Sequence, residues 1–234
     1  MDSILPITGA IAGGAAWMAW AVRGRASSVF ASSVWRGPQD RRAVALTFDD
    51  GPSEGTLALL DLLSRFGVRA TFFQCGVHVR RRPSIARAVA MAGHEIGNHS
   101  DSHPLFCFRS AAYMHAELSR AQAAIQEHTG CRPAWFRAPY GVRWPGLRAA
   151  QEALGLNGVM WTVMGRDYRL PGVAVANRVL KKGAANGAII CLHDGRELAA
   201  KPDIRSTLEA IRIIVPALLD RGFRLETVTG LFKS

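Results

Sequence analysis

Two neighbouring carboxylates, Asp49 and Asp50, stand in the segment TFDDGP. The side chains of adjacent residues at the end of a strand point in opposite directions, so the two carboxylates can do different chemical work. Gly51 and Pro52 favour a sharp turn that exposes them. Because Asp-Gly pairs are also common in ordinary turns and helix caps, this segment by itself does not define a site.

A second cluster, HSDSH, carries His99 and His103. A spacing of four places both imidazoles on one face of a helical turn, where they suit a single metal ion. With Asp50 they form a set of two histidines and one carboxylate that leaves coordination positions open, as metal-assisted hydrolysis requires. Non-haem iron oxygenases use the same ligand set. An oxygenase reaction would give no role to Asp49 or to the three polar clusters that follow later in the chain.

Three more polar clusters follow apolar runs: RAPYG, RDY and LHDG. His193 can transfer a proton near neutral pH, and Asp167 can hold its imidazole in one tautomer. Arg137 can orient a carboxylate, while the amide of Tyr140 can face a developing oxyanion. His193 could instead be a hydrogen-bonded core histidine, with Asp194 beside it capping a helix. Arg137 could instead be a surface residue, one of the 25 arginines of the chain.

Each of these clusters follows a stretch typical of a buried strand, and amphipathic stretches with helical spacing separate them. The carboxyl ends of parallel strands meet at one mouth, so the clusters are expected to converge there. The sequence therefore predicts a single-domain α/β fold, a distorted (β/α)7-type barrel preceded by an apolar helix. Its strands are expected at residues 44–48, 68–73, 94–98, 134–138, 157–163, 187–193 and 223–228.

Taken in order, the five clusters resemble the five motifs of the polysaccharide deacetylase family, the NodB-homology domain of carbohydrate esterase family 4. The resemblance covers about residues 41–230. It implies a hydrolase that binds one divalent metal ion and removes the acetyl group from N-acetylated amino sugars of a polysaccharide or cell-envelope glycan. The metal it implies is zinc, with cobalt, manganese or nickel as alternatives.

The resemblance also implies a role for each matching residue. Asp49 would be the general base, Arg137 its partner, His193 the general acid and Asp167 the residue that tunes His193. The metal ligands would be Asp50, His99 and His103, and the residues on the substrate and oxyanion side would be Tyr140, Pro139, Tyr168 and Leu192.

One residue departs from the family pattern. The fourth motif of the family usually has Trp where this chain has Tyr168. An aromatic wall of the acyl pocket survives the change, but its shape differs, so the preference for acetyl over another acyl group stays open.

Residues 4–22 carry no charge, and Arg23 and Arg25 follow at once. We therefore expect a membrane anchor over residues 1–25, a connector over 26–40 and the deacetylase domain over 41–234. An apolar helix docked on the domain is the alternative. The two arginines favour a cytoplasmic side for the domain, whereas the family resemblance favours the cell envelope. A cytoplasmic domain would suit a lipid-linked amino sugar, which is the alternative substrate.

The 234-residue chain has a formal net charge of +11, which favours anionic partners. Its arginines are dispersed and no nucleic-acid-binding motif is present, so we expect no nucleic acid partner. A hydrophobic content of 49% fits a folded core and excludes a largely disordered chain. A membrane-anchored glycan-binding module without activity is the alternative from another class, and the five intact clusters favour the enzyme. The sequence does not indicate an oligomeric state.

Four cysteines are too few for a disulfide framework. Cys75 and Cys191 are expected as buried thiols next to or within strands. Cys107 and Cys131 could form a disulfide bond outside the cytoplasm.

Overall fold

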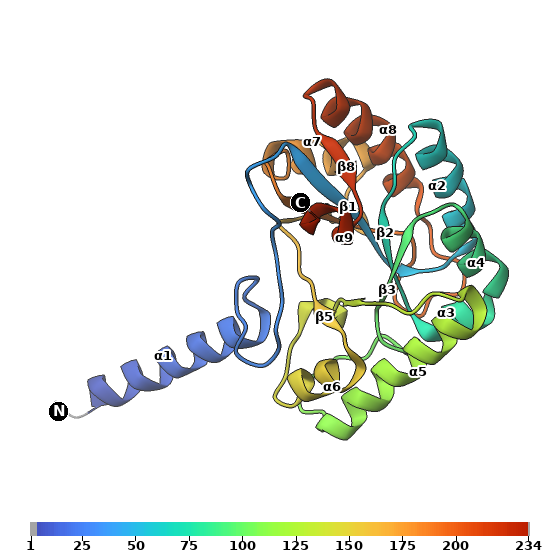
Figure 1. Cartoon of the computed structure of the whole chain (residues 1–234). Helices are drawn as coiled ribbons and strands as arrows, with labels where there is room; N and C mark the ends of the chain where they lie inside the picture. Colours follow the sequence, from blue (N-terminus) through green and yellow to red (C-terminus); the bar gives the residue numbers. More distant parts are fainter. Residues whose placement is uncertain (1–3, 234) are drawn as a thin grey trace.

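A computed structural model describes the backbone of residues 4–233 and the side chains of residues 13–233. Its centre is a parallel eight-stranded sheet in the order β5-β4-β3-β2-β1-β7-β6, with β8 paired to β1. The sheet curls into an incomplete barrel with helices on its outer side (Figure 1). The strands are β1 (Ala43–Gly51), β2 (Thr71–Gln74), β3 (Glu95–Asn98), β4 (Trp135–Phe136), β5 (Asn157–Gly158), β6 (Val163–Met164), β7 (Ala188–His193) and β8 (Arg224–Glu226). The predicted α/β barrel is confirmed.

The helices follow the predicted alternation with the strands. Helix α5 shows why they begin and end where they do: the Ser110 side chain accepts a hydrogen bond from the Tyr113 amide, and Gly130 ends the helix in a left-handed conformation. The main helices are α2 (Glu54–Arg65), α4 (Pro83–Met91), α5 (Ala111–Thr129), α6 (Leu147–Leu154), α7 (Gly172–Lys182) and α8 (Arg205–Asp220). The sequence analysis did not anticipate α3 (Gly76–Arg81), the short 3₁₀ helix η1 (Pro139–Gly141) or α9 (Val228–Phe232).

Strand β1 is buried along its whole length and separates two environments. Val44, Leu46 and Phe48 face the core that the outer helices cover. The alternate residues point the other way because successive side chains of a strand lie on opposite faces. Thr47 and Asp49 are therefore directed into the barrel, where both contact one arginine from another strand end.

The single strand expected over residues 157–163 is wrong. The chain forms the two-residue strands β5 and β6, and the backbone between them leaves the sheet. The carbonyl groups of Val159 and Met160 accept hydrogen bonds from Arg137 instead of from a neighbouring strand. The interrupted segment thus presents backbone carbonyls to a polar side chain inside the barrel.

Residues 34–36, inside the expected connector, lie along this opening. Val34 forms a parallel bridge with Val159, and the Trp35 carbonyl accepts a hydrogen bond from the Thr162 hydroxyl. The Val34 amide donates to the Gly158 carbonyl at 2.9 Å. The segment before β1 therefore supplies backbone partners that the open sheet lacks.

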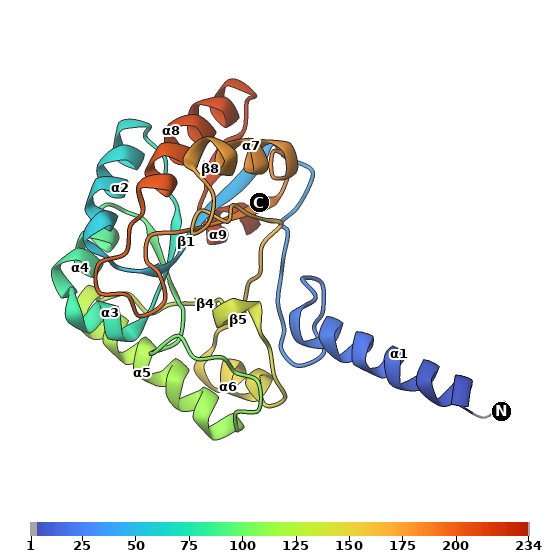
Figure 2. The same cartoon turned by 180° about the vertical axis from the view of Figure 1, so that it is seen from behind.

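Helix α1 (Ile4–Arg23) projects from the body of the domain (Figures 1 and 2). Trp17 and Trp20 are exposed, while Ala21 and Val22 are buried where the helix meets the domain. The anchor expected over residues 1–25 depends largely on residues 1–12, whose side chains lie outside the described part. Within the described residues, no helix is long and apolar enough to cross a membrane.

Arg143 joins the end of α1 to the loop that follows β4. Its side chain is almost completely buried, and its amide donates to the Val22 carbonyl at 3.0 Å. The guanidinium donates to the Ser27 carbonyl at 2.6 Å and to the Gly24 carbonyl. Burial lowers the pKa of this guanidinium. Arg143 thus satisfies backbone groups that would otherwise be buried without donors.

We predict that Arg143→Met lowers the free energy of unfolding by about 1–3 kcal/mol, because buried carbonyl groups lose their donors. Denaturant titration followed by circular dichroism measures the change. Arg132→Met is the matched control, since Arg132 is exposed and makes no side-chain hydrogen bond to the described residues. Equal stability of the two variants would show that the buried guanidinium does not hold this junction.

Candidate active site

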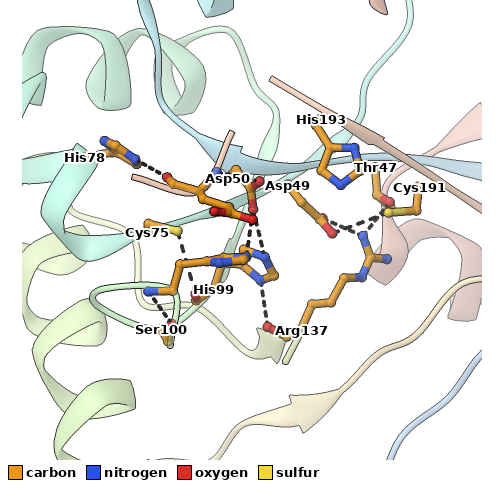
Figure 3. A network of polar contacts seen from close by, with 12 residues as sticks. Thr47, Asp49, Asp50, Cys75, His78, His99, Ser100, Arg137, Cys191 and His193 are labelled. Atoms are coloured by element: carbon orange, nitrogen blue, oxygen red, sulfur yellow. Dashed lines mark hydrogen bonds and ion pairs between the residues drawn. The ribbon is translucent and has the colours of Figure 1, made fainter. Parts of the chain in front are cut away.

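The carboxyl ends of the strands surround a cavity of about 350 Å³. Side chains from all five predicted clusters lie in its wall or directly behind it. Figure 3 shows how Asp49, Asp50, His99, Arg137 and His193 lie relative to one another. The predicted residues that line it are Asp49, Asp50, His99, His103, Tyr140, Tyr168 and His193. The expected convergence on one mouth is confirmed in the geometry.

Asp49 forms an ion pair with Arg137 inside the barrel. Its Oδ1 accepts a hydrogen bond from Nη1 of Arg137 at 2.6 Å. The guanidinium is fully buried, also donates to Thr47, and lies 4.2 Å from the ring centroid of Phe73. The Cys191 thiol contacts the other carboxylate oxygen, Oδ2, at 3.3 Å. The alternative that Arg137 is a surface residue is excluded, and Asp49 is held in one orientation.

Asp50 lies on the other side of the strand end, against two histidines. Its Oδ1 is 3.1 Å from Nε2 of His99 and 3.1 Å from Nε2 of His103. Burial by itself would raise the pKa of Asp50, but the two neighbouring imidazoles outweigh it and hold this pKa well below its ordinary value. Asp50 is therefore ionised, and Asp49 and Asp50 face different partners, as predicted.

The Asp50 carboxylate and the imidazoles of His99 and His103 form a possible cation-binding site. Nδ1 of His99 is 2.7 Å from the carbonyl oxygen of Arg137, so this nitrogen carries the proton and Nε2 presents a lone pair. Oδ1 of Asp50 is buried without a hydrogen-bond donor of good geometry in the described residues. Ligand atoms of Asp50, His99 and His103 all lie within 4.8 Å of one another. Two imidazole nitrogens and one carboxylate oxygen at this separation make a possible site for a divalent transition metal ion.

The two histidines do not come together on a helical turn, so this part of the sequence analysis is wrong. Residues 99–103 form a loop in which Ser100 and His103 have φ angles of 65° and 52°. Asp101 is buried in the middle of the loop and pairs with Arg80 and Arg120 at 2.7 and 3.1 Å. The loop reverses direction around these ion pairs, and that reversal brings the imidazoles together.

His193 is fixed by Asp167. Nδ1 of His193 donates to Oδ1 of Asp167 at 2.8 Å, and the His193 amide donates to Oδ2 at the same distance. Thr207 also donates to Oδ2. Burial by itself would lower the pKa of His193, but the charge and hydrogen bond of Asp167 outweigh it and raise this pKa to about 10. Because Nδ1 is engaged, Nε2 is the nitrogen left for a ligand in the cavity.

Backbone strain concentrates at the same residues. Asp50 and Tyr140, neither of them glycine, have φ angles of 71° and 57°. Left-handed conformations of ordinary residues cost free energy and persist only where the surroundings enforce them. Tyr140 packs its ring edge against His103, with centroids 4.6 Å apart. The loop after β4 is thus fitted closely to the histidine pair.

Two predicted substrate-side residues do not line the cavity. Leu192 is fully buried in the core beneath the outer helices, and Pro139 is buried behind Tyr140. Both stand next to lining residues in the chain, so the motifs located the loops correctly but not these side chains.

Several residues of the cavity wall were not predicted from the sequence. They are Arg23, Trp161, Met164, Arg169, Arg196 and Glu197, together with small residues of the same loops. Arg196 and Glu197 follow the LHDG cluster directly, so position alone was a usable signal for them. Arg23 had no such signal, because it lies 26 residues before Asp49 in the chain.

Comparison with known proteins identifies the family. The polysaccharide deacetylase family matches residues 36–159, and the chain belongs to this family. The chain is 36% identical to a chitooligosaccharide deacetylase of Azorhizobium caulinodans over 80% of this chain and 93% of the relative. It is 34% identical to a peptidoglycan-N-acetylglucosamine deacetylase of Bacillus cereus over 86% and 92% of the two chains.

A solved structure with the same fold comes from a family 4 carbohydrate esterase pseudoenzyme of Bacillus anthracis. The TM-score is 0.79 and the identity 26%, over 86% of this chain and 69% of that chain. A pseudoenzyme is a family member named for missing activity. Family membership therefore does not by itself show catalytic activity, which depends on the residues of the site.

We predict that Asp167→Asn lowers the pKa of His193 from about 10, because the imidazolium loses its buried negative partner. An NMR titration of histidine ring resonances in the metal-free protein measures this pKa. Asp203→Asn serves as the control, since Asp203 is paired with Arg205 on the surface and does not contact His193. An unchanged pKa in the Asp167 variant would show that another group holds the proton on His193.

Proposed function

We propose that this chain is a metal-dependent N-deacetylase that removes the acetyl group from an amino sugar of a polysaccharide or cell-envelope glycan. One observation carries the proposal: Asp49 paired with Arg137, the group of Asp50 and two histidines, and His193 paired with Asp167 all line one cavity. The names of the relatives from Azorhizobium caulinodans and Bacillus cereus support the same reaction.

Asp50, His99 and His103 would hold the metal ion, with zinc as the proposed metal because nitrogen and carboxylate ligands suit it. When bound, such an ion polarises the acetyl carbonyl and acidifies water. The buried hydrogen bond from Nδ1 of His99 to the Arg137 carbonyl keeps this ring in the ligating tautomer.

Asp49 would accept the proton of the attacking water. Arg137 holds Oδ1 through a charged hydrogen bond, whereas the Cys191 thiol is only a weak donor toward Oδ2. Oδ2 is therefore the better acceptor for a new proton. The same guanidinium binds the base and the carbonyls of the interrupted strand, so the base cannot turn away from the cavity.

His193 would protonate the leaving amine from Nε2, because an amine departs poorly as an anion. With a pKa near 10, the imidazole carries its proton at neutral pH. The backbone amide of Tyr140 would stabilise the oxyanion of the tetrahedral intermediate. Tyr168 packs its ring edge on His193, with centroids 5.2 Å apart, and would form one wall of the acyl pocket.

We predict that Asp49→Asn and His193→Ala each lower acetate release from N-acetylated chitooligosaccharides by at least about a hundredfold, because each removes a proton-transfer group. Both variants should still bind one divalent metal ion per chain, measured by elemental analysis after dialysis. His103→Ala should lose metal and activity together, and a chelator should do the same to the unmodified protein. Retained turnover in Asp49→Asn or His193→Ala would contradict these roles. Glycan binding without acetate release by the unmodified protein would support the non-catalytic alternative.

We further propose that α1 attaches the protein to a membrane at the cell envelope. The exposed Trp17 and Trp20 on this projecting helix support the proposal, since indole rings favour membrane interfaces. The lipid-linked amino sugar remains the alternative substrate for a domain on the cytoplasmic side.

We predict that the full chain fractionates with membranes and that Trp17→Ser together with Trp20→Ser shifts it toward the soluble fraction. Fractionation followed by immunoblotting measures the shift, and a reporter fused to the C-terminus reports the side of the membrane. Met91→Ser is the control, because Met91 is exposed on α4 and not on α1. A chain that is soluble without any substitution would contradict the attachment.

A further inference from the structure

Three arginines from different parts of the chain line the mouth of the cavity. Arg23 is the last residue of α1, Arg169 follows β6, and Arg196 follows β7. All three side chains are exposed, and within the described residues none of them forms an ion pair with a carboxylate. Eight other arginines do form such pairs, so these three are available to a ligand.

The charges in the rest of the wall do not neutralise them. Asp49 is paired with Arg137, and the Asp50 carboxylate contacts His99 and His103. Glu197 is the remaining acidic residue of the cavity wall, and its own loop also carries Arg196. His193 adds a further positive charge at neutral pH. The mouth therefore presents an excess of positive charge to whatever enters.

Two of the three arginines are tied to residues of the site. Nη2 of Arg23 is 3.3 Å from the carbonyl oxygen of Tyr140, the residue whose amide would stabilise the oxyanion. The guanidinium of Arg169 lies 5.9 Å from the ring centroid of Tyr168. These contacts keep two positively charged groups beside Tyr140 and Tyr168 in the cavity wall. Guanidinium groups bind carboxylates and phosphates through charged hydrogen bonds.

We propose, building on the deacetylase function, that the substrate is an anionic glycan. In it, the sugar next to the N-acetylated one bears an oxyanion, a carboxylate or a phosphate, that Arg23, Arg169 and Arg196 bind. These arginines are then specificity-determining residues that distinguish an anionic chain from neutral chitooligosaccharide. The two relatives described above are named for one substrate of each kind, since chitooligosaccharide is neutral and peptidoglycan carries carboxylates.

The test compares kcat/KM for matched glycans. The probes are a glycan of alternating N-acetylglucosamine and N-acetylmuramic acid, the same glycan with its carboxylates methyl-esterified, a chitooligosaccharide of equal length, and a phosphorylated N-acetylglucosamine glycan. The first two differ only in charge, and the phosphorylated glycan distinguishes the source of the oxyanion. Variants are Arg23→Gln, Arg169→Gln, Arg196→Gln and the triple combination. Arg212→Gln is the control, since Arg212 is exposed on α8 and outside the cavity.

We expect the protein to prefer one of the anionic glycans over its neutral counterpart, mainly through a lower KM. Each single variant should lower this preference by up to about fivefold, and the triple variant by about tenfold or more. Salt at 0.5 M should weaken the preference in the same direction, and Arg212→Gln should keep it. Because Arg23→Gln also loses a contact to Tyr140, the ratio of the two substrates, and not the absolute rate, is the readout.

Equal kcat/KM for the carboxylated and esterified glycans, with no preference for the phosphorylated one, would overturn the anionic substrate and leave the deacetylase function standing. A preference that persists in the triple variant would overturn the role of these arginines. Acetate release from none of the glycans would overturn both proposals.

Discussion

The buried ion pair between Arg137 and Asp49 is the interaction on which the rest of the site depends. A guanidinium in the middle of a barrel is costly unless every donor finds an acceptor. Here the acceptors are the Asp49 carboxylate, the Thr47 hydroxyl and two backbone carbonyls. The two carbonyls belong to the segment between β5 and β6, so one buried guanidinium contacts both the interrupted strand and the Asp49 carboxylate. The Arg137 carbonyl in turn accepts a hydrogen bond from Nδ1 of His99, so the same residue contacts Asp49 and the histidine pair.

The site also separates its charges by environment. Asp50 is buried but stays ionised, because the imidazoles of His99 and His103 face its carboxylate. His193 is half-buried and stays protonated, because the Asp167 carboxylate faces its imidazole. A negative group and a positive group are thus kept on two sides of one cavity at neutral pH.

Much of this could be predicted from the sequence, because parallel strands bring their carboxyl ends to one place and the five clusters each follow an apolar run. The pairing of Asp167 with His193 followed from residue type and position, whereas the pairing of Arg137 with Asp49 was implied by the family resemblance. The loop around Asp101 could not be predicted, since H-x-x-x-H spacing is the same in a helical turn and in a reversed loop. The break at 159–162 depends on a long-range hydrogen bond from Arg137, which local apolar spacing does not reveal. All four cysteines are free thiols, so a disulfide between Cys107 and Cys131 is not formed.

The residues before β1 have a consequence for where the folding unit begins. The family match starts at residue 36, but hydrogen bonds to the barrel body already start at Val22. Residues 34–36 lie along the opening of the sheet, the Ser27 carbonyl accepts a hydrogen bond from the Arg143 guanidinium, and Arg23 lines the cavity. A boundary drawn from family similarity therefore cuts through structure that this chain uses. In this protein, an evolutionary change at Arg23, in the segment before the shared domain, would alter the wall of the cavity without any change in the five motifs.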